Sequence, residues 1–333
     1  MSEIIKAYKG FDSELKCRGF QYEVGKTYEC EDDIEVCENG FHACCNPLDV
    51  LDYYPLINND CSLNRFCEVE QSGTIDKEDK KQASSILTIK GEIGLPGLIK
   101  ASIEWIRTQV KKDGVASGNS SQLAASGYSR KLAASGNSSQ LAASGYSSQL
   151  AASGYSSKLA ASGYSSKLVA SGNSSQLAAS GNSSQLAASG YSSQLAASGD
   201  YSQLAASGDS SKLAASGDYS KLAASGDSSK LAASGDYSKL AASGYSSKLA
   251  ASGDSSKLAA SGDYSKLAAS GKDSVVMCAG RDSKAKATVG SWITLAEWKN
   301  DKPVAVVTKM VDGKIIKADT WYTLKGGEFV EVD

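Results

Sequence analysis

The stretch GDSSKLAAS, residues 208–216, is one copy of a nine-residue unit that decides the fold of this chain. Seventeen unbroken copies of the unit run from Gly118 to Ser270. The consensus is G-x-S-S-K/Q-L-A-A-S, with Asn, Asp or Tyr in second place and Tyr sometimes in third place. Self-similarity at a fixed period is typical of proteins built from stacked repeats.

A helix does not suit this period. Nine residues make two and a half helical turns, so successive leucines would lie on opposite faces. A disordered linker is compatible with the Ser- and Gly-rich composition, but a linker needs neither a leucine at invariant spacing nor an Ala-Ala pair after it. We therefore predict a parallel β-solenoid, with a short strand over S-K-L-A-A and a turn at S-G-x.

Side-chain alternation in a strand assigns the faces of the unit. Ser211, Leu213 and Ala215 point to one side, and Lys212 and Ala214 point to the other. Because lysine is a poor core residue, the Ser-Leu-Ala side is expected to form the core. One nonapeptide is too short to close a coil, so we expect two units per coil and about nine or ten coils in the stack. Glycine is expected to supply the positive φ of the corner.

The residues at the variable positions predict a surface on which opposite charges compensate each other, so that the surface is neutral as a whole. Asn in second place is accompanied by Gln in fifth place, and Asp is accompanied by Lys in most copies. This pattern matches neither a DNA mimic nor a basic track for nucleic acid. Tyr201, Tyr219 and Tyr237 recur at every second unit and are expected to form a ladder on one side of the rod. Such a ladder can be a contact surface or can simply stack on itself.

The whole chain has 333 residues, a formal net charge of −2 and eight cysteines. It contains no apolar run long enough for a membrane span and no signal-peptide core, so we expect a cytoplasmic protein with free thiols and no membrane contact. The predicted fold is mainly β, in three parts. An α+β head covers 1–112, the solenoid covers 113–289, and an antiparallel β cap covers 290–333. The cap is expected to bury Trp292, Trp298 and Trp321.

One group of residues in the head resembles a metal-binding set. Cys37, His42, Cys44 and Cys45 lie within nine residues. The stretch contains no C-x-x-C pair, and adjacent cysteines in a strand point to opposite faces, whereas structural zinc sites use closely spaced pairs on turns. Buried free cysteines are the usual alternative. We expect no metal and no cofactor.

Two stretches of the head, AYKGF at 7–11 and GFHACCNPLDVLDYY at 40–54, resemble the opening of ADP-ribosyltransferase folds. The resemblance implies an NAD-binding fold in which Lys9, His42 and Glu70 occupy the three functional positions, with Glu68 as another choice for the third. Lys9 stands where that family has Arg or His, and His42 stands where it has Tyr. These departures favour a non-catalytic version of the fold.

Both ends of the chain are also similar to those of a bacterial and phage family in which such a head precedes nonapeptide repeats. The matching stretches are the two head motifs and the closing SWITLAEW and DGKIIKADTWY. This resemblance implies no function.

The favoured function is that of a non-catalytic structural or binding protein, a rigid self-associating solenoid that displays a small binding head. The head's partner is an unidentified protein or small molecule. Position seven of the unit is Ala in every intact copy except Val169, and alternation places it outward. We expect this column to be the oligomer face, represented by Ala124, Val169, Ala214 and Ala241. The alternative is an NAD-binding or NAD-consuming protein.

Overall fold

The computed structural model describes residues 4–333 except 32, 55–63, 79 and 110–113. The chain divides into two compact units, Met1–Gln109 and Val110–Asp333. The repeats and the closing strands belong to the same unit.

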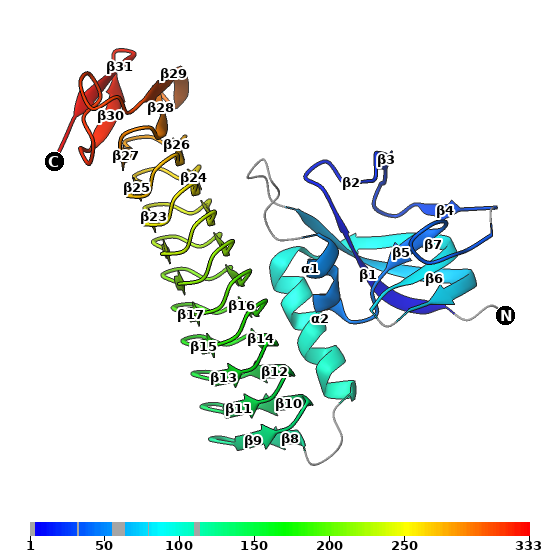
Figure 1. Cartoon of the computed structure of the whole chain (residues 1–333). Coiled ribbons are helices and arrows are strands. Elements are labelled where there is room, and N and C mark those ends of the chain that lie inside the picture. Colours follow the sequence, from blue (N-terminus) through cyan, green and yellow to red (C-terminus); the bar gives the residue numbers. More distant parts are fainter. Residues whose placement is uncertain (1–3, 32, 55–63, 79, 110–113) are drawn as a thin grey trace. The chain divides into compact units, whose positions relative to one another are not determined.

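The first unit, the head, is built on an antiparallel sheet with the strand order β1-β6-β7-β4, and β5 also pairs with β7 (Figure 1). Its strands are β1 (Ile5–Phe11), β2 (Lys16–Cys17), β3 (Phe20–Gln21), β4 (Thr27–Glu29), β5 (Phe41–Ala43), β6 (Arg65–Lys77) and β7 (Gln82–Glu92). Its helices are the 3-10 helix η1 (Pro47–Asp49), α1 (Val50–Tyr53) and α2 (Gly94–Gln109). Asn46 caps the turn of helix that begins at Pro47, and its side chain accepts a hydrogen bond from the Leu48 amide. A core of fully buried side chains packs on one face of the sheet, comprising Ala7, Phe11, Val69, Leu87 and Ile89.

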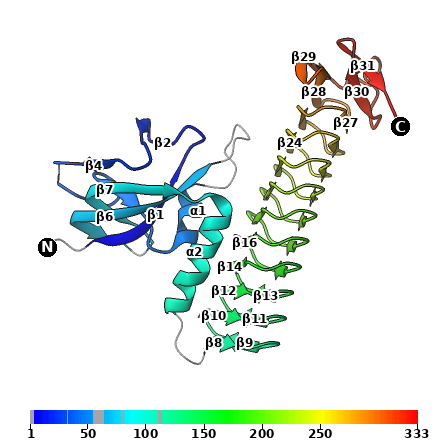
Figure 2. The ribbon, with the colours of Figure 1, turned by 180° about the vertical axis from the view of Figure 1, so that it is seen from behind.

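The second unit is a parallel β-solenoid of about ten turns between residues 116 and 295, as predicted (Figures 1 and 2). Its strands alternate along the chain between two sheets. Sheet 1 contains β8 (Val115–Ser117), β10 (Ser129–Ser135), β12 (Ser147–Ser153), β14 (Ser165–Ala170), β16 (Gln185–Ala188), β18 (Gln203–Ala206), β20 (Lys221–Ala224), β22 (Lys239–Ala242), β24 (Lys257–Ala260), β26 (Val275–Cys278), β28 (Trp292–Lys299) and β29 (Lys302–Met310). Sheet 2 contains β9 (Gln122–Ser126), β11 (Gln140–Ser144), β13 (Lys158–Ser162), β15 (Gln176–Ala179), β17 (Gln194–Ala197), β19 (Lys212–Ala215), β21 (Lys230–Ala233), β23 (Lys248–Ala251), β25 (Lys266–Ala269), β27 (Lys284–Ala287), β30 (Tyr322–Lys325) and β31 (Glu328–Glu331).

The register confirms two units per coil. Leu213 of β19 pairs with Leu231 of β21, and the same offset of two units holds for the other pairs of neighbouring repeat strands. The face assignment is also confirmed: Leu213 and Ala215 are buried, and Lys212 and Ala214 are exposed. The inward serine is satisfied locally, since the Ser211 hydroxyl donates to the Gly208 carbonyl at 2.7 Å. Most coils therefore bury a Leu, an Ala and a Ser from each of their two strands, and most of the inward Ser hydroxyls are hydrogen-bonded, although those of Ser148 and Ser166 have no partner.

The expected role of the repeat glycine was wrong for all units except the first two, in which Gly118 (φ 134°) and Gly127 (φ 131°) have a positive φ. From Gly136 to Gly262 the repeat glycines do not have a left-handed φ. They are required because the backbones of successive coils touch there: a Cβ on Gly208 would lie 2.1 Å from the Gly190 oxygen. The left-handed conformation falls instead on the third residue of most units, as in Ser210 (φ 58°) and Tyr219 (φ 56°).

The Asn and Asp residues in second place bond to the backbone of the next coil. The Asp209 carboxylate accepts a hydrogen bond from the Asp227 amide at 2.9 Å, and Asn173 accepts one from the Tyr191 amide at 3.0 Å. The same bond recurs along both edges of the rod. These side chains therefore complete the backbone hydrogen bonding at the turns, a role that the charge pattern did not predict.

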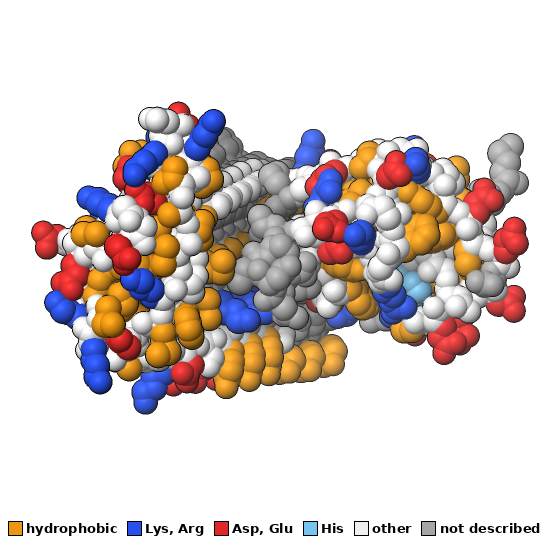
Figure 3. Space-filling model, turned by 90° about the horizontal axis from the view of Figure 1, so that it is seen from above, with side chains coloured by type: hydrophobic (Ala, Val, Ile, Leu, Met, Phe, Trp, Pro, Cys, Tyr) orange, Lys and Arg blue, Asp and Glu red, His pale blue; other side chains and the backbone are white. Residues whose placement is uncertain are grey.

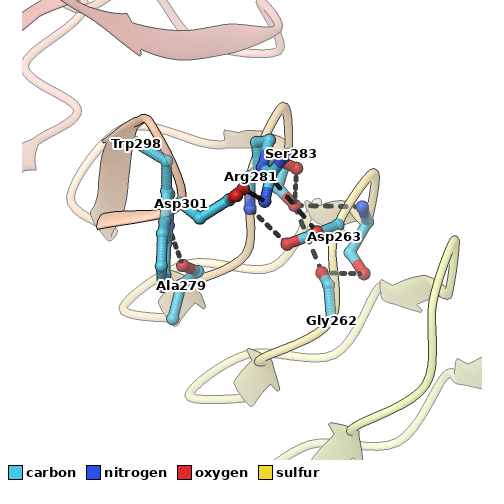
Figure 4. A network of polar contacts seen from close by, with 8 residues as sticks. Gly262, Asp263, Ala279, Arg281, Ser283, Trp298 and Asp301 are labelled. Carbon is cyan, nitrogen blue, oxygen red and sulfur yellow. Dashed lines mark hydrogen bonds and ion pairs between the residues drawn. The ribbon is translucent and has the colours of Figure 1, made fainter. Parts of the chain in front are cut away.

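The closing strands extend both sheets. β28 and β29 form an antiparallel hairpin on sheet 1, and β30 and β31 form one on sheet 2. Arg281 lies between Asp263 and Asp301, and the Trp298 indole donates to the Ala279 carbonyl at 2.8 Å (Figure 4). The expected tryptophan core was wrong, because Trp292 is 47% exposed and Trp298 and Trp321 are only half-buried. The buried residues at this end include Val311, Ile316, Tyr322 and Leu324.

Candidate functional site

The head contains a cavity of about 640 Å³, which is within the usual size range of small-molecule sites. Among its lining residues are Lys9 of β1, His42 of β5 and Tyr54, which follows α1. Two backbone hydrogen bonds of 2.8 Å between Tyr8 and Cys44 bring these segments together. The two head motifs therefore meet at one site, although Lys9 and His42 lie far apart in the sequence.

Lys9 lies in this cavity wall with its side chain almost completely buried. It is 5% exposed, and its ammonium donates to the His42 carbonyl at 2.8 Å. The nitrogen is also 5.6 Å from the ring centroids of both Phe11 and Tyr22. Burial lowers the pKa of the Lys9 amine, because a charged group loses hydration there. Among the described residues, no carboxylate lies within ion-pair distance of Lys9.

His42 is held as a neutral side chain. Its Nε2 accepts a hydrogen bond from the Cys37 amide at 2.9 Å. Burial, with a smaller contribution from nearby Lys9, lowers the pKa of His42 to about 4. At neutral pH this imidazole therefore acts as an acceptor inside the wall of the cavity.

The third residue of the ADP-ribosyltransferase hypothesis lies elsewhere. Lys9 pairs with Cys67 across β1 and β6, whereas Glu70 pairs with Lys6. Because strand side chains alternate, Glu70 lies on the face of the sheet opposite to Lys9. Its carboxylate is 3.1 Å from the Lys90 ammonium. Glu68, the other choice for this position, lies on the same face as Glu70. Its carboxylate forms an ion pair with the Lys6 ammonium at 2.9 Å.

Sequence reasoning missed four charged residues that line the cavity: Arg18, Glu38, Asp52 and Lys81. Asp52 is paired with Lys80 at 2.9 Å, and the Lys81 ammonium contacts the Cys37 sulfur at 2.7 Å. One available signal was Gly19 between two short alternating stretches, because glycine in the second turn position is typical of a two-residue hairpin.

Three cysteines, Cys17, Cys30 and Cys44, line the head cavity together with His42. In the described part of the chain, no group of three or more His, Cys, Asp and Glu side chains is arranged to hold a metal ion. Cys37 is exposed, and Cys44 is buried. Cys61 lies outside the described residues.

The predicted oligomer residues fall on two different faces of the solenoid. Ala124 and Ala214 lie on sheet 2 and are exposed, whereas Val169 and Ala241 lie on sheet 1, where Val169 is buried and Ala241 is half-buried. Position seven therefore forms one column on each sheet rather than a single stripe. On sheet 2 the column is exposed from Ala124 to Ala250, and shallow grooves on either side of it separate it from the Gln/Lys and Ser columns.

Tyrosine rings form ladders along one edge of the rod. The rings of Tyr201, Tyr219 and Tyr237 stack with centroid distances of 5.1 and 4.9 Å, so this part of the prediction is confirmed. A second stack, which was not predicted, contains Tyr128, Tyr146 and Tyr164. Figure 3 shows hydrophobic side chains in a regular row along the solenoid.

The fold defines a class of repeat protein, a parallel β-solenoid joined to an antiparallel β head. Residues 5–101, which contain the cavity, match the family described as "Domain of unknown function (DUF7666)". The comparisons with curated proteins and with solved structures found no match. Within the described residues, no helix has the length and apolar character needed to cross a membrane.

Proposed function

We propose that this protein is a non-catalytic structural protein, a rigid solenoid that associates with a second copy of itself and displays a small-molecule-binding head. The observation that carries the proposal is the column of small apolar side chains along sheet 2. Ala124, Ala160 and Ala214 are exposed members of this column. An isolated rod gains nothing from keeping the column small and apolar, whereas a flat alanine surface allows another sheet to pack at about 10 Å.

The flanking columns are compatible with a parallel partner. Gln and Lys side chains, as in Gln194 and Lys212, lie on one side of the alanines, and serines such as Ser216 lie on the other. A two-fold axis parallel to the rod reverses left and right, so it places the Lys column of one copy over the Ser column of the other. The lysines of the two copies then avoid each other, and closed symmetry prevents open fibres.

Light scattering on the full chain tests the self-association. We expect a dimeric or higher mass at micromolar concentration. Replacing Ala160, Ala196 and Ala232 together by Lys should reduce the mass to that of the monomer, because three buried charges would face the partner. The matched control replaces Tyr155 and Tyr191, which are exposed in turns, by Lys. A wild-type chain that is monomeric, or an alanine variant that keeps its mass, would contradict the proposal.

The second candidate is an ADP-ribosyltransferase-like NAD-binding protein. The placement of Lys9 and His42 in one cavity favours it, whereas the position of Glu70 argues against NAD consumption. Incubation with NAD and measurement of released nicotinamide test this candidate. We expect no release, and turnover that His42→Ala abolishes would make it the better description.

A further inference from the structure

Lys9, in the wall of the head cavity, has no carboxylate partner among the described residues. Lys9 is only 5% exposed, and its polar contacts are the His42 carbonyl and the Cys17 thiol rather than a carboxylate. A buried ammonium without a counter-ion is costly. A ligand that brings a negative charge to Lys9 would remove that cost, so the position of Lys9 indicates an anionic ligand.

A second cation at the cavity occupies a strained backbone position. Arg18 and Gly19 link β2 to β3, with φ values of 51° and 80°. Two-residue hairpins of this kind strongly favour Asn, Asp or Gly at the first position, because both residues are left-handed. Arginine gains nothing there from backbone preference. Since Arg18 also lines the cavity, the strain is of the kind that is found at ligand sites.

Part of the wall is aromatic, and the Glu38 and Asp52 carboxylates and the Lys81 ammonium also line the cavity. Phe20, Tyr22 and Tyr54 line the cavity, and Phe20 is 50% exposed. Gly10 allows Tyr54 to approach β1, because a Cβ on Gly10 would lie 2.5 Å from the Tyr54 Cβ. Aromatic walls of this kind suit a flat ring, and two cations suit a phosphate, which carries more than one charge.

We propose that the head cavity binds a phosphate monoester of a ring-bearing molecule, of about the size of a nucleoside monophosphate. The phosphate reaches Lys9 and Arg18, and the ring lies against Phe20, Tyr22 and Tyr54. The inference rests on the proposed function, in which the head is a small-molecule-binding module, and it specifies the ligand class. It requires no reaction at the site.

Isothermal titration calorimetry on the full chain tests the proposal, with AMP as the probe. Adenosine supplies the ring without the phosphate, and inorganic phosphate supplies the anion without the ring. We expect AMP to bind and each of the two fragments to bind at least about tenfold more weakly. No heat of binding with millimolar AMP would overturn the proposal, as would adenosine binding as tightly as AMP.

Two variants locate the binding to this cavity. Lys9→Met and Arg18→Asn should each weaken AMP binding by about tenfold or more, the loss expected when a charge-assisted hydrogen bond is removed. Arg18→Asn should also raise the melting temperature of the head, because Asn suits the left-handed position. Loss of binding with a higher melting temperature cannot result from misfolding. Lys26→Met is the control, since Lys26 is exposed and paired with Glu23. Unchanged AMP affinity in both cavity variants would contradict the proposal.

Light scattering on the same samples separates this inference from the proposed self-association. A multimeric chain that fails to bind AMP contradicts only the ligand class. A monomeric chain that binds AMP contradicts only the role of the solenoid.

Discussion

Gly208 lies directly against the backbone of Gly190 in the coil below it, so that a Cβ on residue 208 would be 2.1 Å from the Gly190 oxygen. Gly208→Ala should therefore force the two coils apart and lower the free energy of unfolding of the solenoid by about 3 kcal/mol. Chemical denaturation followed by circular dichroism measures the change. Gly91→Ala is the control, because no atom would lie within 4 Å of its Cβ. Equal effects would mean that coil contact is not what requires glycine.

The leucine column forms the core of the solenoid. Leu195 is 2% exposed, so Leu195→Asp should destabilise the rod by several kcal/mol, since an unpaired carboxylate would be buried. Lys212→Ser, on the outward side, should change the free energy of unfolding by less than about 0.5 kcal/mol. Denaturant titration of both variants checks the assignment of faces. A large loss from Lys212→Ser would show that the outward column also supports the stack.

The third residue of the unit adopts a conformation that its side chain disfavours. Ser210 has a φ of 58°, which costs a non-glycine residue roughly 1 kcal/mol. Ser210→Asn should leave the rod as stable or more stable by a few tenths of a kcal/mol, because Asn tolerates this region well. The neighbouring Ser211→Asn should be clearly destabilising, because Ser211 is fully buried and bonded to Gly208. Thermal melts of the two variants distinguish these outcomes. If Ser210→Asn were the more destabilising of the two, Ser210 would not be the strained position.

The stability of the head should depend on His42 between about pH 4 and pH 6.5. Its pKa is about 4 in the folded chain, compared with an ordinary value of 6.5, so in this window the unfolded chain binds the proton and the folded chain does not. Stability therefore falls as the pH is lowered through this window, and the contribution is fully present above it. His42→Gln keeps an acceptor for the Cys37 amide but does not titrate. Melting curves at pH 4.5 and pH 7 should show a smaller difference for the variant, and an unchanged difference would refute the assignment.

The structure of the repeat region could be predicted because each nine-residue unit contains the pattern that determines it. The invariant Leu and the alternation around it fixed the strand, the buried face and the coil of two units. The reason for the glycine could not be found in the same way, since Gly208 meets Gly190 only after the coil has closed. Serine disfavours the left-handed backbone conformation that Ser210 adopts, and the stacking of the coils imposes that conformation.

The arrangement of the head could not be predicted in this way, because it depends on strand pairings that the two sequence motifs do not specify. The Tyr8–Cys44 bridge brings Lys9 and His42 to one cavity, and the register of β1 on β6 turns Glu70 to the opposite face. A shift of one residue in that register would reverse the result for Glu70. The position of a catalytic carboxylate in such a sheet is therefore decided by strand pairing, and a short motif does not predict it.

The coil of two units restricts how this chain can change its length during evolution. Loss or gain of two units removes or adds one rung of about 4.8 Å and leaves every later strand on its own sheet. Loss of a single unit would exchange the two sheets for all later repeats. The hairpin of β28 and β29 would then meet the wrong sheet. Recombination between repeats is expected to be tolerated in even steps, and natural length variants should differ by whole coils.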